Sequence, residues 1–244
     1  MHKKNPLFSI VIPVYNEEKM IDVCIDFLEA QVGDFDYEII VVNNNSTDKT
    51  RAIVEKRNVI LIDEMVPGVG VARRAGTAVA RGQYIMHVDA DTHLPPSYLH
   101  EVLRRFDRDQ KLACVGGQFF YYDAPVWIGF LRFFTHWGLW FFSALVSLGK
   151  VGPMGNNMTF KKEVYDKTAG FDAHLKYGED MDLCRKLSAF GRVWLDMRLR
   201  CEISVRRFVL NKRLWVYFLN FLTMSIVGKS YDNELPHPDE IDAS

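Results

Sequence analysis

Short apolar runs alternate with stretches of helical character in the first half of the chain. The runs are rich in β-branched residues, as is typical of strands buried on both faces of a sheet; they are residues 8–14, 38–42, 58–62 and 83–88. Helices are expected between them, at residues 20–28, 47–56 and 70–81, and in the first of these the apolar residues recur at helical spacing. Such alternation predicts parallel strands joined by crossover helices. We therefore expect an α/β fold, Rossmann-like, with a mostly parallel central sheet flanked by helices.

The pattern becomes less regular after residue 95. Pro95 and Pro96 open a further predicted helix, because proline is tolerated in a first helical turn, and a strand near 112–121 follows. Residues 125–149 are densely aromatic and apolar, but their uncharged stretch is shorter than the roughly 20 residues that span a bilayer. A second apolar stretch is expected as a C-terminal helix over 211–230. We expect 125–149 and the core of the second stretch, 213–228, to contact a membrane surface or to form a homo-oligomer interface.

The length of the chain suits one sizeable domain. We predict a single domain over 1–232, composed of a nucleotide-binding half (8–122) and an acceptor-side half (123–210), and a flexible tail over 233–244. Thirty basic and 31 acidic residues give a net charge of -1, which argues against a nucleic-acid partner. The four cysteines lack the spacing of a zinc site or a disulfide framework, and no signal-peptide core follows the basic start. These features predict a cytoplasmic protein.

Two carboxylates follow the strand at 83–88 directly. Asp89 and Asp91 are expected at the carboxyl end of a parallel strand, where open α/β sheets bind their ligands. Two carboxylates one residue apart suit a hard divalent cation, Mg²⁺ or Mn²⁺, whose other positions are shared with phosphate oxygens. A strand-to-turn junction in which the aspartates bond nearby backbone is an equal alternative from the residues alone.

Five blocks occur in an order and at a spacing that together are specific. They are IPVYNEE at 12–18, VVNNNSTD at 41–48, GVARRAGTAVARGQYI at 70–85, DADT at 89–92 and GED at 178–180. In this order they resemble family 2 of the inverting glycosyltransferases, over residues 8 to about 205. The resemblance implies the glycosyltransferase A-type fold, a nucleotide-diphosphate sugar as donor, and hexosyltransferase-like chemistry.

The resemblance also implies where the nucleotide binds. Pro13 and Tyr15, with Glu17 behind them, correspond to residues that pack on the base, and the tyrosine offers a stacking face. Asn44 corresponds to a position that usually carries an acid for the base, and this departure puts the identity of the base in doubt because an amide both donates and accepts. An ordinary strand end and a helix-capping turn are the structural alternatives for these residues.

The donor phosphates and the metal are assigned in the same way. Arg73 falls where the family places a basic residue near the nucleotide, and a guanidinium can hold phosphate oxygens bidentately. The resemblance makes Asp91 the principal metal ligand and has Asp89 contact the ribose or the metal. His93, two residues on, is a further candidate ligand, although a loop histidine that bonds backbone is the commoner case.

The acids at 178–180 begin a predicted helix. The resemblance makes Asp180 the catalytic base that removes the acceptor hydroxyl proton. Because a helix N-terminus favours the ionised carboxylate, we expect Asp180 to be an intrinsically weak base; stabilisation of the helix dipole is the structural alternative. Asn156 and Asn157 are candidates to orient sugar hydroxyls or to form a turn, and Arg206 or Arg207 is expected to replace electrostatically a histidine that many relatives carry.

The sequence thus predicts a metal-dependent inverting glycosyltransferase that acts on a glycan or lipid-linked acceptor, in the synthesis of cell-surface glycan or glycolipid at the inner face of the membrane. A membrane-associated polysaccharide synthase subunit is the nearest rival. A nucleotidyltransferase of related fold would share the metal carboxylates, but it needs a glycine-rich, basic triphosphate loop that IPVYNEE does not provide.

Overall fold

A computed structural model describes residues 5–125, 152–175, 178–206 and 223. The strands are β1 (Phe8–Val14), β2 (Tyr37–Asn43), β3 (Ile60–Asp63), β4 (Tyr84–Val88), β5 (Leu112–Tyr121), β6 (Asn157–Lys161) and β7 (Arg192–Ile203). The helices are α1 (Ile21–Glu29), α2 (Thr50–Val54), α3 (Val69–Val79), α4 (Tyr98–Arg108), α6 (Lys162–Tyr165) and α7 (Glu179–Leu187).

The strands form one seven-stranded sheet in the order β3-β2-β1-β4-β6-β5-β7. The first four strands are parallel, as the alternating pattern predicted, and β5 pairs in parallel with β7. Only β6 runs antiparallel to its neighbours, so the described sheet is mostly parallel. The predicted fold class is confirmed, and the predicted elements of the first half lie within a few residues of the observed ones.

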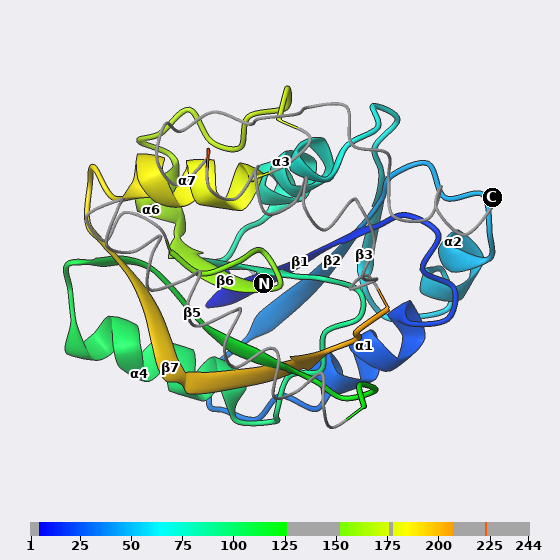
Figure 1. The fold of residues 1–244 in the computed structure, drawn as a ribbon, viewed down its shortest axis with the longest axis horizontal. Coiled ribbons are helices and arrows are strands. Elements are labelled where there is room, and N and C mark those ends of the chain that lie inside the picture. The colour runs from blue at the N-terminus through cyan, green and yellow to red at the C-terminus, as the bar shows by residue number, and fades with distance from the viewer. Residues whose placement is uncertain (1–4, 126–151, 176–177, 207–222, 224–244) are drawn as a thin grey trace.

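Helices cover both faces of the sheet. Figure 1 shows α3, α6 and α7 on one side of it and α1 and α4 on the other. Side chains alternate along β1, so Phe8, Ile10 and Ile12 join the apolar cluster under α1 and α4, whereas Val11 joins the cluster under α3 and α7. The central strands are therefore buried on both faces, which explains why they read as continuous apolar runs.

Helix α3 packs unusually close to the sheet. A Cβ atom at Gly76 would lie 2.3 Å from Val11 Cγ1, so only glycine permits this approach. Arg73 precedes Gly76 by about one helical turn and therefore shares the face that meets the sheet. The close packing of α3 brings this arginine to the end of β4.

The predicted domain boundaries remain predictions, since most of 125–149, 211–230 and 233–244 lies outside the described residues. Within the described parts of the chain, no helix is both long enough and apolar enough to cross a membrane.

Candidate active site

The buried centre of the site is Arg73, on α3. Its Nη2 donates to Asp89 Oδ1 at 2.7 Å, its Nε to Glu179 Oε1 at 3.3 Å, and its Nη1 to the carbonyl of Gly155 at 3.0 Å. Only 3% of Arg73 is exposed. Burying a guanidinium is costly unless it is paired and hydrogen-bonded, and here each of its three nitrogens has an acceptor, two of them carboxylates. Arg73 thereby joins the end of β4 to the start of α7.

Asp180 occupies the first turn of α7. Gly178 precedes the helix with a φ of +74°, a left-handed conformation that glycine adopts without strain. Asp180 Oδ2 accepts the N–H of Gly155 at 2.8 Å, and Oδ1 accepts the N–H of Met181 at 2.7 Å. Gly155 therefore bonds Arg73 through its carbonyl and Asp180 through its amide, and a Cβ atom there would lie 2.4 Å from Arg73 Nη2. The carboxylate is held in one orientation.

Burial controls the protonation of the two acids of α7. It raises the pKa of Asp180, and Asp89 raises it further, whereas the amide of Gly155 and the charge of Arg73 lower it. The pKa of Glu179 is raised to about 7, again mainly by burial and then by the neighbouring charge of Asp180. The expectation of a weak base from the helix N-terminus is therefore wrong, because desolvation outweighs the helix dipole here.

A second arginine lies at the other side of the β4 end. Arg206, which follows β7, forms an ion pair with Glu17, and its Nε lies 3.5 Å from Asp91 Oδ2. Glu17 comes from the loop after β1 and is buried. The structure thus brings β1, β4 and the end of β7 together around Asp91, and it places Arg206 where the sequence analysis expected a replacement charge.

Residues 9–168, well over half of the chain, match the model of "Glycosyl transferase family 2". The chain belongs to glycosyltransferase family 2. This confirms the family and class of enzyme that the ordered motifs predicted.

Curated family 2 relatives share a segment of the chain. The chondroitin synthase of Pasteurella multocida is 34% identical over 115 residues, which are 45% of this chain and 12% of that protein. The poly(ribitol-phosphate) beta-glucosyltransferase of Bacillus spizizenii is 40% identical over 94 residues, 35% of this chain and 15% of that protein. The aligned segments therefore span less than a sixth of the length of these two relatives.

Solved structures share the fold over almost the whole chain. A mannosyltransferase from Pyrobaculum calidifontis, in complex with GDP-Man and Mn²⁺, has a TM-score of 0.70 at 20% identity and covers 96% of this chain and 67% of its own. Glucosyl-3-phosphoglycerate synthase from Mycobacterium tuberculosis, in complex with Mn²⁺ and UDP-glucose, has a TM-score of 0.68 at 18% identity, with 91% and 79% covered. At these identities the likeness shows the fold alone.

His93 does not join Asp89 and Asp91 in the way the motif suggested. Its ring stacks between Phe27 and Tyr122, with ring centroids 4.3 and 4.1 Å away, and its backbone pairs with Glu202 of β7. Across the described ranges, no group of three His, Cys, Asp or Glu side chains could hold a metal ion. The prediction of His93 as a third ligand is therefore wrong, because the aromatic stack and the strand pairing with β7 take the residue.

Asn44 has a structural role in this family 2 chain. Its Nδ2 donates to the carbonyls of Glu64 and Val66, both at 2.8 Å, and its Oδ1 accepts the N–H of Gly68 at 2.8 Å. Both N–H groups are used, so the amide has no donor left for a base. The predicted base contact is corrected: Asn44 holds the loop that leads into α3.

The loop after β1 is fastened to the loop after β2. Asn16, at a φ of +53°, accepts the N–H of Thr47 through its side chain at 2.8 Å, and the N–H of Glu17 donates to Thr50 Oγ1 at 2.7 Å. Pro13, in β1 itself, and Tyr15, just beyond its end, therefore lie beside a loop of defined shape. These cross-loop bonds were not predicted, although the asparagine- and threonine-rich composition of both loops was a signal for them.

The two candidate asparagines before β6 differ. Asn157 is the first residue of the strand, and its N–H closes a turn by donating to the carbonyl of Met154 at 3.4 Å, so the turn interpretation is confirmed. Its side chain exchanges two hydrogen bonds with the backbone of Gly117, so the sugar-binding interpretation is wrong. Asn156 is also buried, yet none of the described residues forms a hydrogen bond with its Oδ1. Because Asn157 pairs with Val88 and Gly155 bonds Arg73, Asn156 lies at the edge of the site with unused hydrogen-bonding capacity.

A cavity of about 990 Å³ lies at the opposite edge of the sheet, at the amino ends of β1, β2 and β4. Its lining includes Leu7, Asp36 and Gln83 and none of the predicted site residues. The cavity is therefore separate from the chemistry at the carboxyl ends of the strands.

Proposed function

We propose that the protein transfers a sugar from a nucleoside-diphosphate sugar to an acceptor hydroxyl, with inversion at the anomeric carbon and with dependence on Mn²⁺ or Mg²⁺. One observation carries the proposal: Arg73 bonds both Asp89 at the end of β4 and Glu179 at the start of α7, beside Asp180. Acids 91 residues apart in the chain thus meet at the edge where open α/β sheets bind ligands.

The chemistry of the donor set fits a divalent cation. Asp89 and Asp91 offer hard carboxylate oxygens, and the absence of a three-residue cluster among the described residues leaves positions for donor phosphate oxygens, as Mg²⁺ and Mn²⁺ sites often do. When bound, such a cation stabilises the negative charge that develops on the departing diphosphate. Arg73, fixed on Asp89, adds positive charge on the same side.

Asp180 is the proposed catalytic base. The backbone amides of Gly155 and Met181 hold its two oxygens, and each carboxylate oxygen retains a lone pair for an acceptor hydroxyl. Asp180 accepts the hydroxyl proton, the hydroxyl oxygen bonds to the anomeric carbon, and the bond from that carbon to the diphosphate breaks. Its raised pKa increases its strength as a base.

The loop after β1 is the proposed nucleotide site. Pro13 and Tyr15 are assigned to the base, with Glu17 behind them. The fastened loops support this assignment, because a stacking residue needs a backbone of defined position.

We assign the acceptor to the glycan or lipid-linked class and the site of action to the inner face of the membrane. The apolar sequences at 125–149 and 213–228, which suit a membrane surface or an oligomer interface, support this assignment. A polysaccharide synthase subunit is the second candidate, because the matched relatives include a chondroitin and a hyaluronan synthase. Product length separates the two: a single added sugar favours the transferase, and a growing polymer favours the synthase.

A donor screen tests the proposal. UDP-, GDP- and dTDP-sugars are added with and without Mn²⁺, and a true donor raises the unfolding temperature, by an amount equivalent to about 2.7 kcal/mol at a hundredfold excess over Kd. We expect one class to stabilise the protein mainly with Mn²⁺, Asp91→Ala to remove this dependence, and the exposed control Asp107→Ala to retain it. Equal donor affinity with and without Mn²⁺ contradicts the proposed metal dependence.

A further inference from the structure

Arg206 lies between two acids that follow different strands, Glu17 after β1 and Asp91 after β4. Its guanidinium pairs with Glu17 and lies 3.5 Å from Asp91 Oδ2. The side chains of Glu17 and Asp91 are 1% and 6% exposed, whereas that of Arg206 is 28% exposed. The contact with Glu17 is the closer one. The Nε that faces Asp91 is buried and has no hydrogen-bond partner among the described residues.

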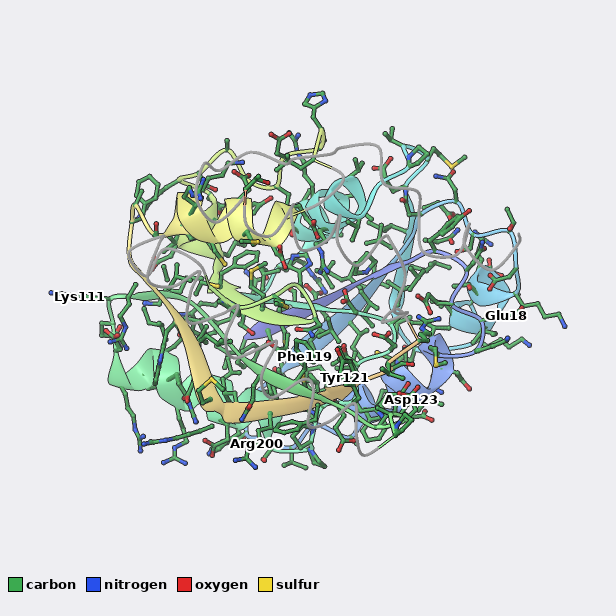
Figure 2. All side chains as sticks on the ribbon, viewed as in Figure 1. Glu18, Lys111, Phe119, Tyr121, Asp123 and Arg200 are labelled. Atoms are coloured by element: carbon green, nitrogen blue, oxygen red, sulfur yellow. The ribbon has the colours of Figure 1, made fainter. Side chains whose placement is uncertain are left out.

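The approach of Arg206 to this position is built into the fold. Asp123, just after β5, accepts hydrogen bonds from Ser204 Oγ at 2.6 Å and from the N–H of Val205 at 2.7 Å. Ser204 Oγ in turn accepts the N–H of Arg206 at 3.2 Å. Figure 2 labels Asp123, which anchors the chain where it leaves β7. The backbone of Arg206 is thus held, while its side chain is 28% exposed and its Nε makes no hydrogen bond to any described residue.

We propose that Arg206 competes with the divalent cation for Asp91, and that on donor binding it remains on Glu17 and transfers its second contact from Asp91 to the donor diphosphate. The inference rests on the proposed function. A cation that binds Asp91 repels the guanidinium. The guanidinium of an arginine binds phosphate oxygens at least as well as it binds carboxylate oxygens. Glu17 keeps Arg206 within the site during the exchange.

The proposal predicts a change in cation affinity that does not depend on catalysis. A unit positive charge a few ångströms from a cation site, at the effective dielectric of a protein surface, lowers cation affinity by roughly tenfold or more. Removal of the Arg206 charge is therefore expected to raise the affinity for Mn²⁺ by about that factor. Arg200 supplies a matched control, since it is an exposed arginine of β7 that lies well apart from Asp123 in Figure 2.

Mn²⁺ binding without nucleotide, followed by the electron paramagnetic resonance signal of free Mn²⁺, tests the competition. We expect Arg206→Ala and Arg206→Gln to bind Mn²⁺ about tenfold more tightly than the unchanged protein. Arg200→Ala is expected to bind as the unchanged protein does, and Asp91→Asn to bind more weakly. The glutamine variant is included because alanine leaves Glu17 buried without this partner, and glutamine can still bond it. Equal or weaker Mn²⁺ binding by both Arg206 variants overturns the proposal.

Calorimetry with UDP and GDP at saturating Mn²⁺ tests the second contact. Loss of the guanidinium is expected to weaken binding of the diphosphate several-fold in Arg206→Gln and to leave it unchanged in Arg200→Ala. Unchanged or tighter diphosphate binding in Arg206→Gln overturns this part. The Mn²⁺ titrations also separate this inference from the proposed function. If Asp91→Asn does not change Mn²⁺ binding, the proposed function is contradicted. If Mn²⁺ binding depends on Asp91 but not on Arg206, only this inference is contradicted.

Discussion

Two arginines meet the acids at the end of β4, and their surroundings differ. Arg73 is 3% exposed and bonds Asp89, Glu179 and the carbonyl of Gly155. Arg206 is 28% exposed, and its distance to Asp91 is 3.5 Å. The first arginine is enclosed by acceptors from three elements, while the second faces solvent on one side.

The difference separates a fixed part of the site from an exchangeable one. Moving Arg73 leaves a buried guanidinium, the buried Glu179 and the partly exposed Asp89 without their ion pairs, which costs several kcal/mol. Arg206 is held less firmly on its Asp91 side, because its Nε lies 3.5 Å from Asp91 Oδ2 and makes no hydrogen bond to any described residue. We infer that the Arg73 cluster holds the proposed base in place, whereas the Arg206 cluster changes when ligands bind.

The largest expected effect is on catalysis by the fixed cluster. Asp180→Asn is expected to lower the transfer rate by about 10²- to 10⁴-fold, because an amide cannot accept the hydroxyl proton. Metal-dependent donor binding is expected to persist, since Asp180 bonds backbone rather than the end of β4. Steady-state rates and donor calorimetry measure the two quantities.

Asp182→Asn is the control for this variant, because Asp182 lies in the same helical turn and pairs with Lys186. We expect it to retain most activity. Similar rates for both variants contradict the assignment of Asp180 as the base.

The second test removes the centre of the fixed cluster. Arg73→Met keeps the length of the side chain but leaves Asp89 and Glu179 without their guanidinium, so we expect the free energy of unfolding to fall by about 3 to 5 kcal/mol. Arg74→Met, at the exposed neighbouring position, is expected to change it by less than about 0.5 kcal/mol. Chemical denaturation measures the unfolding free energy of both variants. If Arg73→Met is as stable as Arg74→Met, Arg73 is no more fixed in its site than Arg206.

The sequence predicted the regular half of the fold because a strand that is buried on both faces consists of a continuous run of apolar residues. It did not predict β7, whose buried Leu199 and Cys201 alternate with charged residues, and whose ladder with β5 is irregular between Gly117 and Gln118. Strand β6 was also missed, since it begins with Asn157 and ends with Lys161. Two-residue periodicity in 192–203 was an available signal for β7.

The limits of the site predictions have related physical causes. The motifs indicated Asp89, Asp91 and Asp180 because acids adjoin predicted strand and helix ends. His93 was misassigned because its backbone partner, Glu202, belongs to the strand that was not predicted. The sequence named Asn44 but did not indicate the three backbone groups that its amide bonds. The composition of the loops indicated that their side chains would bond backbone, but it did not indicate which distant backbone groups they would reach.

The third test uses the pH dependence of stability within the fixed cluster. The pKa of Glu179 is raised to about 7, so between the ordinary glutamate range and pH 7 the folded protein holds a proton that the unfolded chain has lost. Folding stability contributed by this group is therefore greatest below that window and falls as pH rises through it, by about 1.4 kcal/mol for each unit of pKa difference.

Glu179→Gln removes this contribution. We expect the unfolding free energy of the variant, relative to the unchanged protein, to increase as the pH is raised from about 4.5 to 7. Denaturation at several pH values measures the slope. Glu163→Gln, at an exposed position of the short helix α6, is the control. If the difference in unfolding free energy between Glu179→Gln and the unchanged protein does not vary with pH, the cluster around Arg73 is more hydrated than its contacts indicate.

The smallest expected effects concern the neighbouring residues Asn156 and Asn157. They differ in how far the hydrogen-bonding groups of their side chains are satisfied. Asn157 donates to the carbonyl of Gly117 at 3.1 Å and accepts its N–H at 3.0 Å, whereas the buried Oδ1 of Asn156 has no partner within the described ranges. Asn157→Ala leaves the buried N–H and carbonyl of Gly117 without their side-chain partner, so we expect a loss of about 2 to 3 kcal/mol in unfolding free energy. Asn156→Ala removes an unsatisfied acceptor and is expected to change stability by less than about 0.5 kcal/mol.

For ligand binding we expect the opposite order, with the larger effect in Asn156→Ala and the smaller in Asn157→Ala. If Asn156 supplies hydrogen bonds to a sugar hydroxyl, Asn156→Ala weakens binding of the nucleotide sugar or of the acceptor by roughly 1 kcal/mol, about fivefold, while binding of the bare nucleoside diphosphate is unchanged. Calorimetry with the sugar nucleotide, the bare diphosphate and the acceptor separates these cases. A loss of stability in Asn156→Ala similar to that in Asn157→Ala, without a change in binding, assigns Asn156 to the framework of the sheet and removes it from the sugar site.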